Sequence, residues 1–148
     1  MRKATRLLVA CVGGALTIIA APQVRASDGV LFSCATKSGK VIELKDSGKT
    51  IDYSYGKPGQ PEIALRVPRE NASTHQWDGM GSTESYEVDV PNGDTVYTVY
   101  SSIDKNEQSA TAGVLVTVKG RQLADVRCAD TANRVDHLEG VSLKARDD

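Results

Sequence analysis

An alternation of apolar and polar residues in 112–128 constrains the fold of this chain more than any other feature. Valine recurs at every second position over 114–118, which is the period of a strand with one buried face. Lys119 and Gly120 follow, and glycine favours a tight reversal because it adopts positive φ without steric cost. Residues 123–128 then alternate again as a returning strand. The segment is predicted to be a β-hairpin that closes a β-structure.

The first 26 residues predict a signal peptide, which implies a periplasmic or secreted protein. A basic start precedes an apolar run at 7–21, and Ala26 completes a cleavage pattern of small and medium residues. The run is shorter than the roughly 20 residues of a membrane span, so no stable membrane insertion is predicted. The alternative is a lipoprotein signal that ends at Cys11. Most of the apolar run would then follow the cysteine instead of preceding it.

Removal of residues 1–26 leaves an acidic chain that is long enough for one domain with a real core. It keeps all 19 acidic residues but only 14 of the 18 basic ones, a net charge of −5 with both histidines neutral. An acidic exported domain is a poor binder of nucleic acid or of anionic membranes. The acidity suits a basic protein partner, although modest net charge also serves solubility alone.

Two cysteines remain after removal of the signal peptide, because Cys11 lies within it. Two cysteines in an oxidising compartment normally pair. We therefore predict a Cys34–Cys128 disulfide that ties the first strand of the domain to the last. The absence of a C-x-x-C motif argues against the alternative of a reactive thiol pair.

Short alternating runs, separated by turn residues, recur through residues 27–128. The pattern predicts a single all-β domain, an antiparallel barrel or sandwich of about eight strands. A longer loop is expected at 56–61, where two prolines and two glycines cannot extend a ladder. Residues 129–148 form a polar C-terminal tail that is expected to fray. The predicted strands lie at 30–36, 41–45, 50–55, 62–67, 83–90, 95–103, 112–118 and 123–128.

Residues 69–82 break the strand rhythm and contain the single tryptophan. Trp77 is interpreted either as a plug over one end of the barrel or as an exposed anchor for a partner. Glycines on both sides of Met80 imply a fixed loop shape. Two tyrosines on the strand at 95–103 add a second partner surface. The predicted partner-binding residues are therefore His75, Trp77, Asp78, Met80, Tyr97 and Tyr100.

The sequence lacks the residue patterns of enzyme and metal chemistry. His75 and His137 lie far apart without ligand spacing, and no G-x-S-x-G elbow occurs. Glu87 and Asp89 share a strand face, but outward carboxylates beside a polar turn are far more often solvated than catalytic. Residues 79–81 are not a phosphate-binding loop, since they lack a lysine and a strand-to-helix setting. We expect a protein that is not an enzyme and uses no cofactor or metal.

Several short motifs follow one another between residue 30 and the last cysteine. They include Y-x-Y-G at 53–56, W-x-G-M-G at 77–81, Y-x-V-Y at 97–100, A-G-V at 112–114 and finally Cys128. In this layout the chain resembles a group of small exported proteobacterial proteins. The resemblance implies a shared fold and assigns no activity.

A looser likeness is to periplasmic inhibitors of animal-type lysozyme, which are small β-barrels with a similar end-to-end disulfide. Their motifs are S-G-x-x-Y and Y-x-x-x-K-G. Here Ile42 and Ile51 stand at the tyrosine position of the two S-G sites, and Leu115 stands at the tyrosine position of the K-G site. No inhibitory residue therefore transfers by motif.

The leading hypothesis is an exported non-enzymatic protein that binds and blocks a protein partner. A basic cell-wall hydrolase is the expected target, which makes the chain a lysozyme inhibitor or an immunity protein against a toxin. The alternative is a β-barrel that binds a small envelope ligand at its mouth, where eight strands leave room for one small molecule. An enzyme is the third class.

Overall fold

The computed structural model describes residues 29–130 and 133–147. The predicted signal peptide at 1–26 and the alternative lipidation at Cys11 lie outside these residues. Within them the chain forms eleven strands and one turn of 3-10 helix, so the predicted all-β class is confirmed. No helix in this part of the chain is long and apolar enough to cross a membrane.

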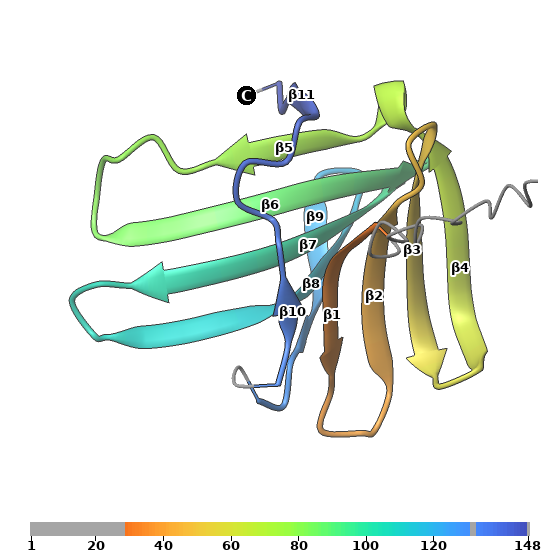
Figure 1. Cartoon of the computed structure of the whole chain (residues 1–148), viewed down its shortest axis with the longest axis horizontal. Coiled ribbons are helices and arrows are strands. Elements are labelled where there is room, and N and C mark those ends of the chain that lie inside the picture. Colours follow the sequence, from red (N-terminus) through yellow and green to blue (C-terminus); the bar gives the residue numbers. More distant parts are fainter. Residues whose placement is uncertain (1–28, 131–132, 148) are drawn as a thin grey trace, which may run out of the picture.

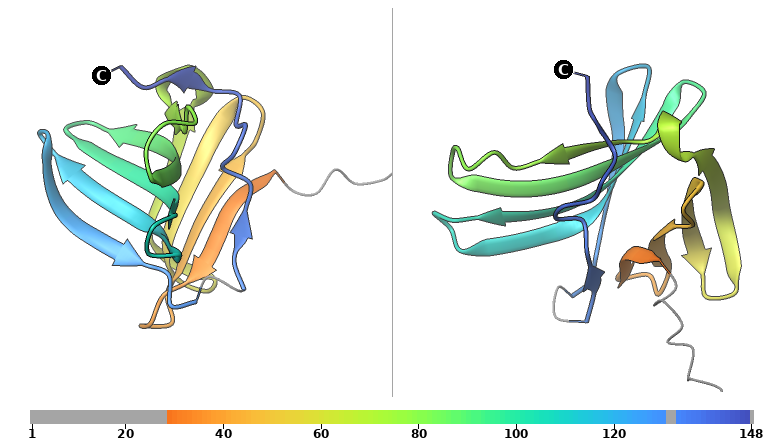
Figure 2. Two further views of the ribbon diagram at one scale, coloured as in Figure 1. Left: turned by 90° about the vertical axis from the view of Figure 1, so that its left-hand side faces the viewer. Right: turned by 45° about the horizontal axis from the view of Figure 1, so that its top comes forward.

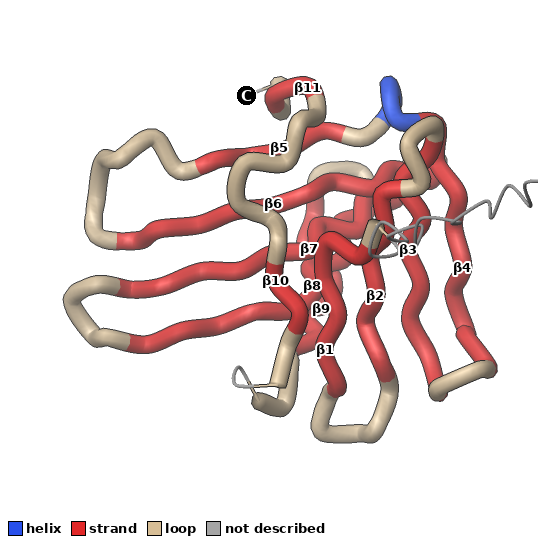
Figure 3. Tube along the Cα trace, in the orientation of Figure 1, coloured by secondary structure: helices blue, strands red, loops and turns tan. Residues whose placement is uncertain are grey.

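The strands form two sheets (Figures 1 and 3). The first has the order β10-β1-β2-β3-β4, and the second has the order β11-β5-β6-β7-β8-β9. Strand β11 is parallel to β5, and the other neighbours are antiparallel. The first sheet comprises β1 (Val30–Ala35), β2 (Val41–Asp46), β3 (Thr50–Lys57), β4 (Gln60–Pro68) and β10 (Val135–Asp136). The second comprises β5 (Ser73–Gln76), β6 (Thr83–Asn92), β7 (Thr95–Asp104), β8 (Ser109–Val118), β9 (Arg121–Arg127) and β11 (Lys144–Ala145), and η1 (Arg69–Asn71) links the sheets.

All eight predicted strands are present, but two of the predicted connections are wrong. The expected loop at 56–61 is a tight turn at Pro58 and Gly59, because β3 and β4 extend to either side of these two residues. The expected irregular stretch at 69–82 contains η1 and β5. Strand β5 is polar and lacks apolar alternation. Its pairing with β6 defines it, and that pairing is not visible in the local sequence.

The core lies between the two sheets, which face each other (Figure 2). Tyr53 of the first sheet stacks on Tyr97 of the second, with ring centroids 5.0 Å apart. Full burial of an apolar side chain contributes about 1.5–3 kcal/mol, so the inter-sheet contact dominates the stability of the fold. The side chains buried most completely are Phe32, Ile42, Leu44, Ile51 and Tyr53 from the first sheet and Val88, Val90, Val99 and Val114 from the second.

The β8–β9 hairpin has the predicted two-residue turn. Lys119 and Gly120 have φ values of 48° and 75°, and two successive positive values are typical of the type I′ turn that suits a hairpin. Val114 lies opposite Val126, and both contact the core. At Gly113 a Cβ atom would lie 2.2 Å from the carbonyl oxygen of Val126. Glycine is therefore needed for β9 to approach β8 this closely.

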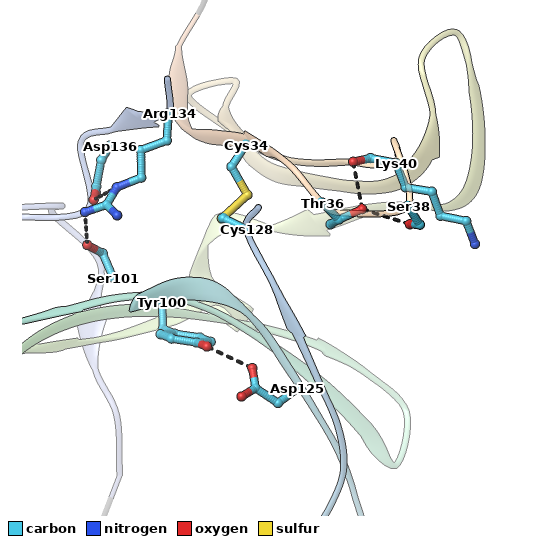
Figure 4. Close-up of a disulfide and its surroundings, with 10 residues drawn as sticks. All are labelled: Cys34, Thr36, Ser38, Lys40, Tyr100, Ser101, Asp125, Cys128, Arg134 and Asp136. Atoms are coloured by element: carbon cyan, nitrogen blue, oxygen red, sulfur yellow. Dashed lines mark hydrogen bonds and ion pairs between the residues drawn. A yellow bond between two sulfur atoms is a disulfide. The ribbon is translucent and has the colours of Figure 1, made fainter. Parts of the chain in front are cut away.

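A disulfide joins Cys34 of β1 to Cys128, the residue after β9, as predicted (Figure 4). Beside it, an isolated bridge pairs Thr36 with Cys128. The backbone N–H of Ala129 also donates to the carbonyl oxygen of Ala35 over 2.8 Å. The two sheets therefore meet along one corner, where a covalent bond and backbone hydrogen bonds coincide.

Residues 133–147, which we call the strap, cross from one sheet to the other (Figure 1). Strand β10 pairs with β1, and β11 pairs with β5. Between them Leu138 is fully buried. Gln76 donates to the carbonyl oxygen of Leu138 over 2.9 Å and accepts from the N–H of Gly140 over 2.7 Å. The expectation of a frayed tail is wrong, because pairing with distant strands and one apolar anchor outweigh its polar composition.

Arg146 fastens the end of the strap to the outer face of the second sheet. Its Nε and Nη2 donate to Asp89 over 2.5 and 2.9 Å, and Nη2 also donates to Glu87 over 2.5 Å. Burial lowers the pKa of Arg146, but these bonds outweigh burial and raise it. Thr98 donates to Asp89 over 2.6 Å, and Asp89 is only 8% exposed. The expectation that Glu87 and Asp89 are solvated is therefore wrong, because Arg146 pairs with both and Asp89 is buried.

Candidate functional site

Two loops lie side by side at the open end of the β6–β7 hairpin, where β6 begins and β7 ends. They are the β5–β6 loop (77–82) and the end of β7 with its turn into β8 (103–108). The N–H of Lys105 donates to the carbonyl oxygen of Ser82 over 2.9 Å and joins them. In Figure 1 these loops lie at the left edge, away from the first sheet. We call residues 77–82 and 103–108 the hairpin tip.

Hydrogen bonds inside the β5–β6 loop hold its shape. The indole Nε1 of Trp77 donates to the carbonyl oxygen of Met80 over 2.7 Å. The N–H of Met80 donates to Asp78 Oδ1 over 3.0 Å. Gly79 and Gly81 have φ values of 89° and 80°, which residues with a Cβ rarely adopt. The predicted fixed shape therefore has a structural basis in these bonds and glycines.

Lys105 covers one face of the tryptophan. Its Nζ lies 3.5 Å from the centroid of the Trp77 ring, within the range of a cation–π interaction. The same ammonium lies 3.3 Å from Glu84 Oε2. Lys105 thus links the two loops through its backbone and its side chain, and it adds rigidity to the tip.

The tip presents apolar side chains to the surrounding space. Met80 is 73% exposed and Ile103 is 41% exposed. Trp77 is half-buried but does not belong to the hydrophobic core cluster. The interpretation of Trp77 as a plug over the barrel is therefore not supported. An exposed methionine next to a fixed tryptophan is the kind of surface that protein partners contact.

The structure separates Tyr97 and Tyr100 from the tip. Tyr97 packs against the core and stacks on Tyr53. Tyr100 is only 8% exposed, and its hydroxyl donates to Asp125 over 2.8 Å (Figure 4). Burial, with a contribution from this bond, raises the pKa of Tyr100 to about 12. The expectation that both rings face outward is wrong, because residues three apart in a strand point to opposite faces.

His75 is exposed but lies in β5, opposite Glu87, and outside the tip. Conversely, Lys105 and Ile103 belong to the tip although the sequence did not predict them as site residues. The register of β6 and β7, in which Thr83 lies opposite Asp104, brings them there. A tight turn at Gly93 and Asp94 joins β6 to β7 and fixes that register. Counting back from Asn92-Gly93, a sequence typical of hairpin turns, would have located Ile103 and Lys105 beside the β5–β6 loop.

The described residues contain no metal-ligand cluster. No group of three or more histidine, cysteine, aspartate or glutamate side chains among them could hold a metal ion. The two carboxylates considered as a catalytic pair, Glu87 and Asp89, are both occupied by Arg146.

Comparison of the chain with protein-family models, with curated proteins and with solved structures finds no match.

The position of the single tryptophan can be tested by fluorescence quenching. Because Trp77 lies in a loop outside the core, iodide is expected to quench the native protein readily. Lys105→Ala is expected to increase quenching by neutral acrylamide, because the ammonium group no longer covers the ring. Full protection from both quenchers would place the ring in the interior and contradict this geometry.

Proposed function

We propose that the protein is an exported, non-enzymatic binding protein that blocks a protein partner with its hairpin tip. The observation that carries the proposal is the fixed β5–β6 loop, in which Met80 is 73% exposed beside a tryptophan held by Lys105 and by the loop backbone. A pre-organised loop loses little conformational freedom on binding. It therefore suits insertion into a partner's cleft.

The charge of the tip favours a basic partner. Residues 77–82 and 103–108 contain Asp78, Asp104 and Glu107 against one cation, Lys105, and Lys105 is paired with Glu84. An acidic surface speeds association with a positively charged cleft and disfavours acidic partners. The target that fits best is a basic cell-wall hydrolase, such as a lysozyme or a toxin that degrades the wall.

The structure of the body also supports an exported binder. The Cys34–Cys128 disulfide suits an oxidising compartment. The space between the sheets is filled by core side chains from both of them, which favours a surface interaction over a ligand held between the sheets.

The proposal is tested by capture and inhibition. The purified mature protein is incubated with a panel of lysozymes and wall-degrading toxins, and both complex formation and residual hydrolase activity are measured. Retention of one hydrolase with loss of its activity is the expected result. A protein that captures none of them and leaves their activity untouched would remove the proposed function.

Trp77→Ala is expected to weaken binding to the captured partner by about 2 kcal/mol or more, because a central aromatic anchor is lost. Met80→Ser is expected to weaken it in the same direction. The matched control is Leu123→Ser, which removes an exposed apolar side chain (60% exposed) from β9, outside the tip. Calorimetric titration measures all three, and thermal unfolding verifies the fold. Equal losses for Met80→Ser and Leu123→Ser would show that the tip is not the contact surface.

A further inference from the structure

Two adjoining hollows lie at the opposite end of the β6–β7 hairpin from the tip. The larger, about 620 Å³, is lined by the β2–β3 turn, the end of β4, η1 and residues 142–144 of the strap. The other, about 500 Å³, is lined by the end of β4 and the β6–β7 turn. Pro68 and Lys144 line both, so the two hollows adjoin, and together we call them the trough.

The trough is basic although the chain is acidic. Its lining contains four cations, Lys49, Arg66, Arg69 and Lys144, and one carboxylate, Glu70. We call these four cations the basic corner.

Two of the four cations have no partner in the described part of the chain. The described residues include ten ion pairs, and none of them involves Lys49 or Lys144. Both side chains belong to exposed residues. Arg66 pairs with Asp52, but its side chain is 76% exposed. Positive charge is therefore available to an incoming anion.

Arg69 holds the two walls of the trough in place. Its backbone N–H donates to the carbonyl oxygen of Lys49 over 3.0 Å. Its Nη2 donates to the carbonyl oxygen of Ser142 in the strap over 2.7 Å, and its Nη1 pairs with Asp46. The backbones that carry Lys49 and Lys144 are thus both tied to Arg69. The backbone positions from which the Lys49 and Lys144 side chains extend are therefore held relative to each other.

We infer that the basic corner binds a linear acidic glycan. The cations are distributed over two adjoining hollows, which suits charges repeated along a chain better than a single small anion. No aromatic residue lines either hollow, so nucleobases have no surface on which to stack. None of the large exposed hydrophobic residues, Met80, Ile103, Leu123 and Val135, lies there, so a lipid surface has no apolar anchor.

Neutral polar side chains in the two hollows can form hydrogen bonds with the hydroxyl groups of a glycan. The lining includes Thr50 and Ser142 in one hollow and Asn71 and Asn92 in the other. Hydroxyl and amide groups both donate and accept hydrogen bonds, as the hydroxyl groups of a sugar do. The corner and the tip lie at opposite ends of one hairpin, so an envelope glycan and a protein partner can be bound together.

The test uses the mature protein and a heparin decasaccharide as the probe. Calorimetry at low salt is expected to show binding that weakens as salt rises. The double variant Lys49→Ala/Lys144→Ala is expected to weaken it by about tenfold. The matched control is Lys37→Ala/Arg121→Ala, which removes the same charge from two exposed residues that make no ion pair with the described residues and line neither hollow. The control is expected to bind as the unmodified protein does.

Three outcomes would overturn the inference. The first is the absence of binding at low salt. The second is an equal loss in both double variants, which would show that net charge alone governs the interaction. The third is that a single-stranded oligonucleotide or anionic phospholipid vesicles bind more tightly than the decasaccharide does. That result would show that the basic corner binds nucleic acid or a membrane surface and not a glycan. Thermal unfolding of all variants verifies that the fold is kept.

Discussion

The double variant Cys34→Ala/Cys128→Ala is expected to unfold with a free energy about 4 kcal/mol lower than that of the unmodified protein. The reason lies in the unfolded chain. The disulfide joins residues 94 positions apart, and closing so long a loop removes many unfolded conformations. Urea unfolding, followed by far-ultraviolet circular dichroism, measures the change.

The reduced, unmodified protein is the control for this variant. Cys34 is 4% exposed, so replacement by alanine also leaves a small void in the core, whereas reduction keeps both sulfur atoms. The decrease in unfolding free energy on reduction therefore measures the effect of opening the loop alone. The further decrease in the alanine variant measures the effect of the void. A total loss below about 1 kcal/mol would show that the corner between the sheets does not need its covalent tie.

Arg146→Ala is expected to lower the free energy of unfolding by about 3 kcal/mol, near the lower end of the effect of breaking a buried ion pair. The side chain of Arg146 is 33% exposed, while those of Glu87 and Asp89 are 20% and 11% exposed. Loss of the guanidinium leaves two adjacent carboxylates without their cation, and water reaches Asp89 poorly. The same change releases the end of the strap from the second sheet.

Arg127→Ala is the matched control for Arg146→Ala. Arg127 also pairs with an aspartate, at 2.7 Å from Asp125, but its side chain is 65% exposed. Solvent screening limits such pairs to about 0–1 kcal/mol. Chemical denaturation of both variants at neutral pH gives the comparison. Equal losses in the two variants would mean that burial of the Asp89 carboxylate carries no energetic weight.

The strands and the disulfide could be predicted because their signals are local or follow from counting. Alternation over 114–118, the glycine at 120 and the matching alternation before Cys128 each predict a neighbouring element. In the structure these elements form one hairpin with Val114 opposite Val126. The pairing of the cysteines could be predicted by counting, because only Cys34 and Cys128 follow the predicted signal peptide.

The strap could not be predicted because its signals are distant from it. Residues 133–147 are mostly polar, and one buried side chain, Leu138, is too weak a pattern for a periodicity argument. The order of the strap comes from β1 and β5, which are far away in the chain. Arg146 and Asp89 are likewise 57 positions apart, and nothing in either neighbourhood indicates the other.

The candidate site was predicted in part. The two glycines around Met80 predicted a fixed loop, and the φ values at 79 and 81 agree with it. The partner of the tryptophan, Lys105, comes from a second loop and depends on the register of β6 and β7. The expectation that Tyr97 and Tyr100 form a partner surface is wrong because strand β7 is buried on both faces along its middle, and residue type alone does not distinguish those faces.

The strap has a consequence for aggregation. A bare sheet edge is a template for pairing with another chain, and natural proteins protect edges with prolines, charges and bulges. Strand β4 carries Pro61 and Pro68, and β9 has a register shift opposite Val116. Without the strap, β1 and β5 would be the other two edge strands, and the strap pairs with them through β10 and β11. A chain cut before residue 133 would present two unprotected templates and self-associate.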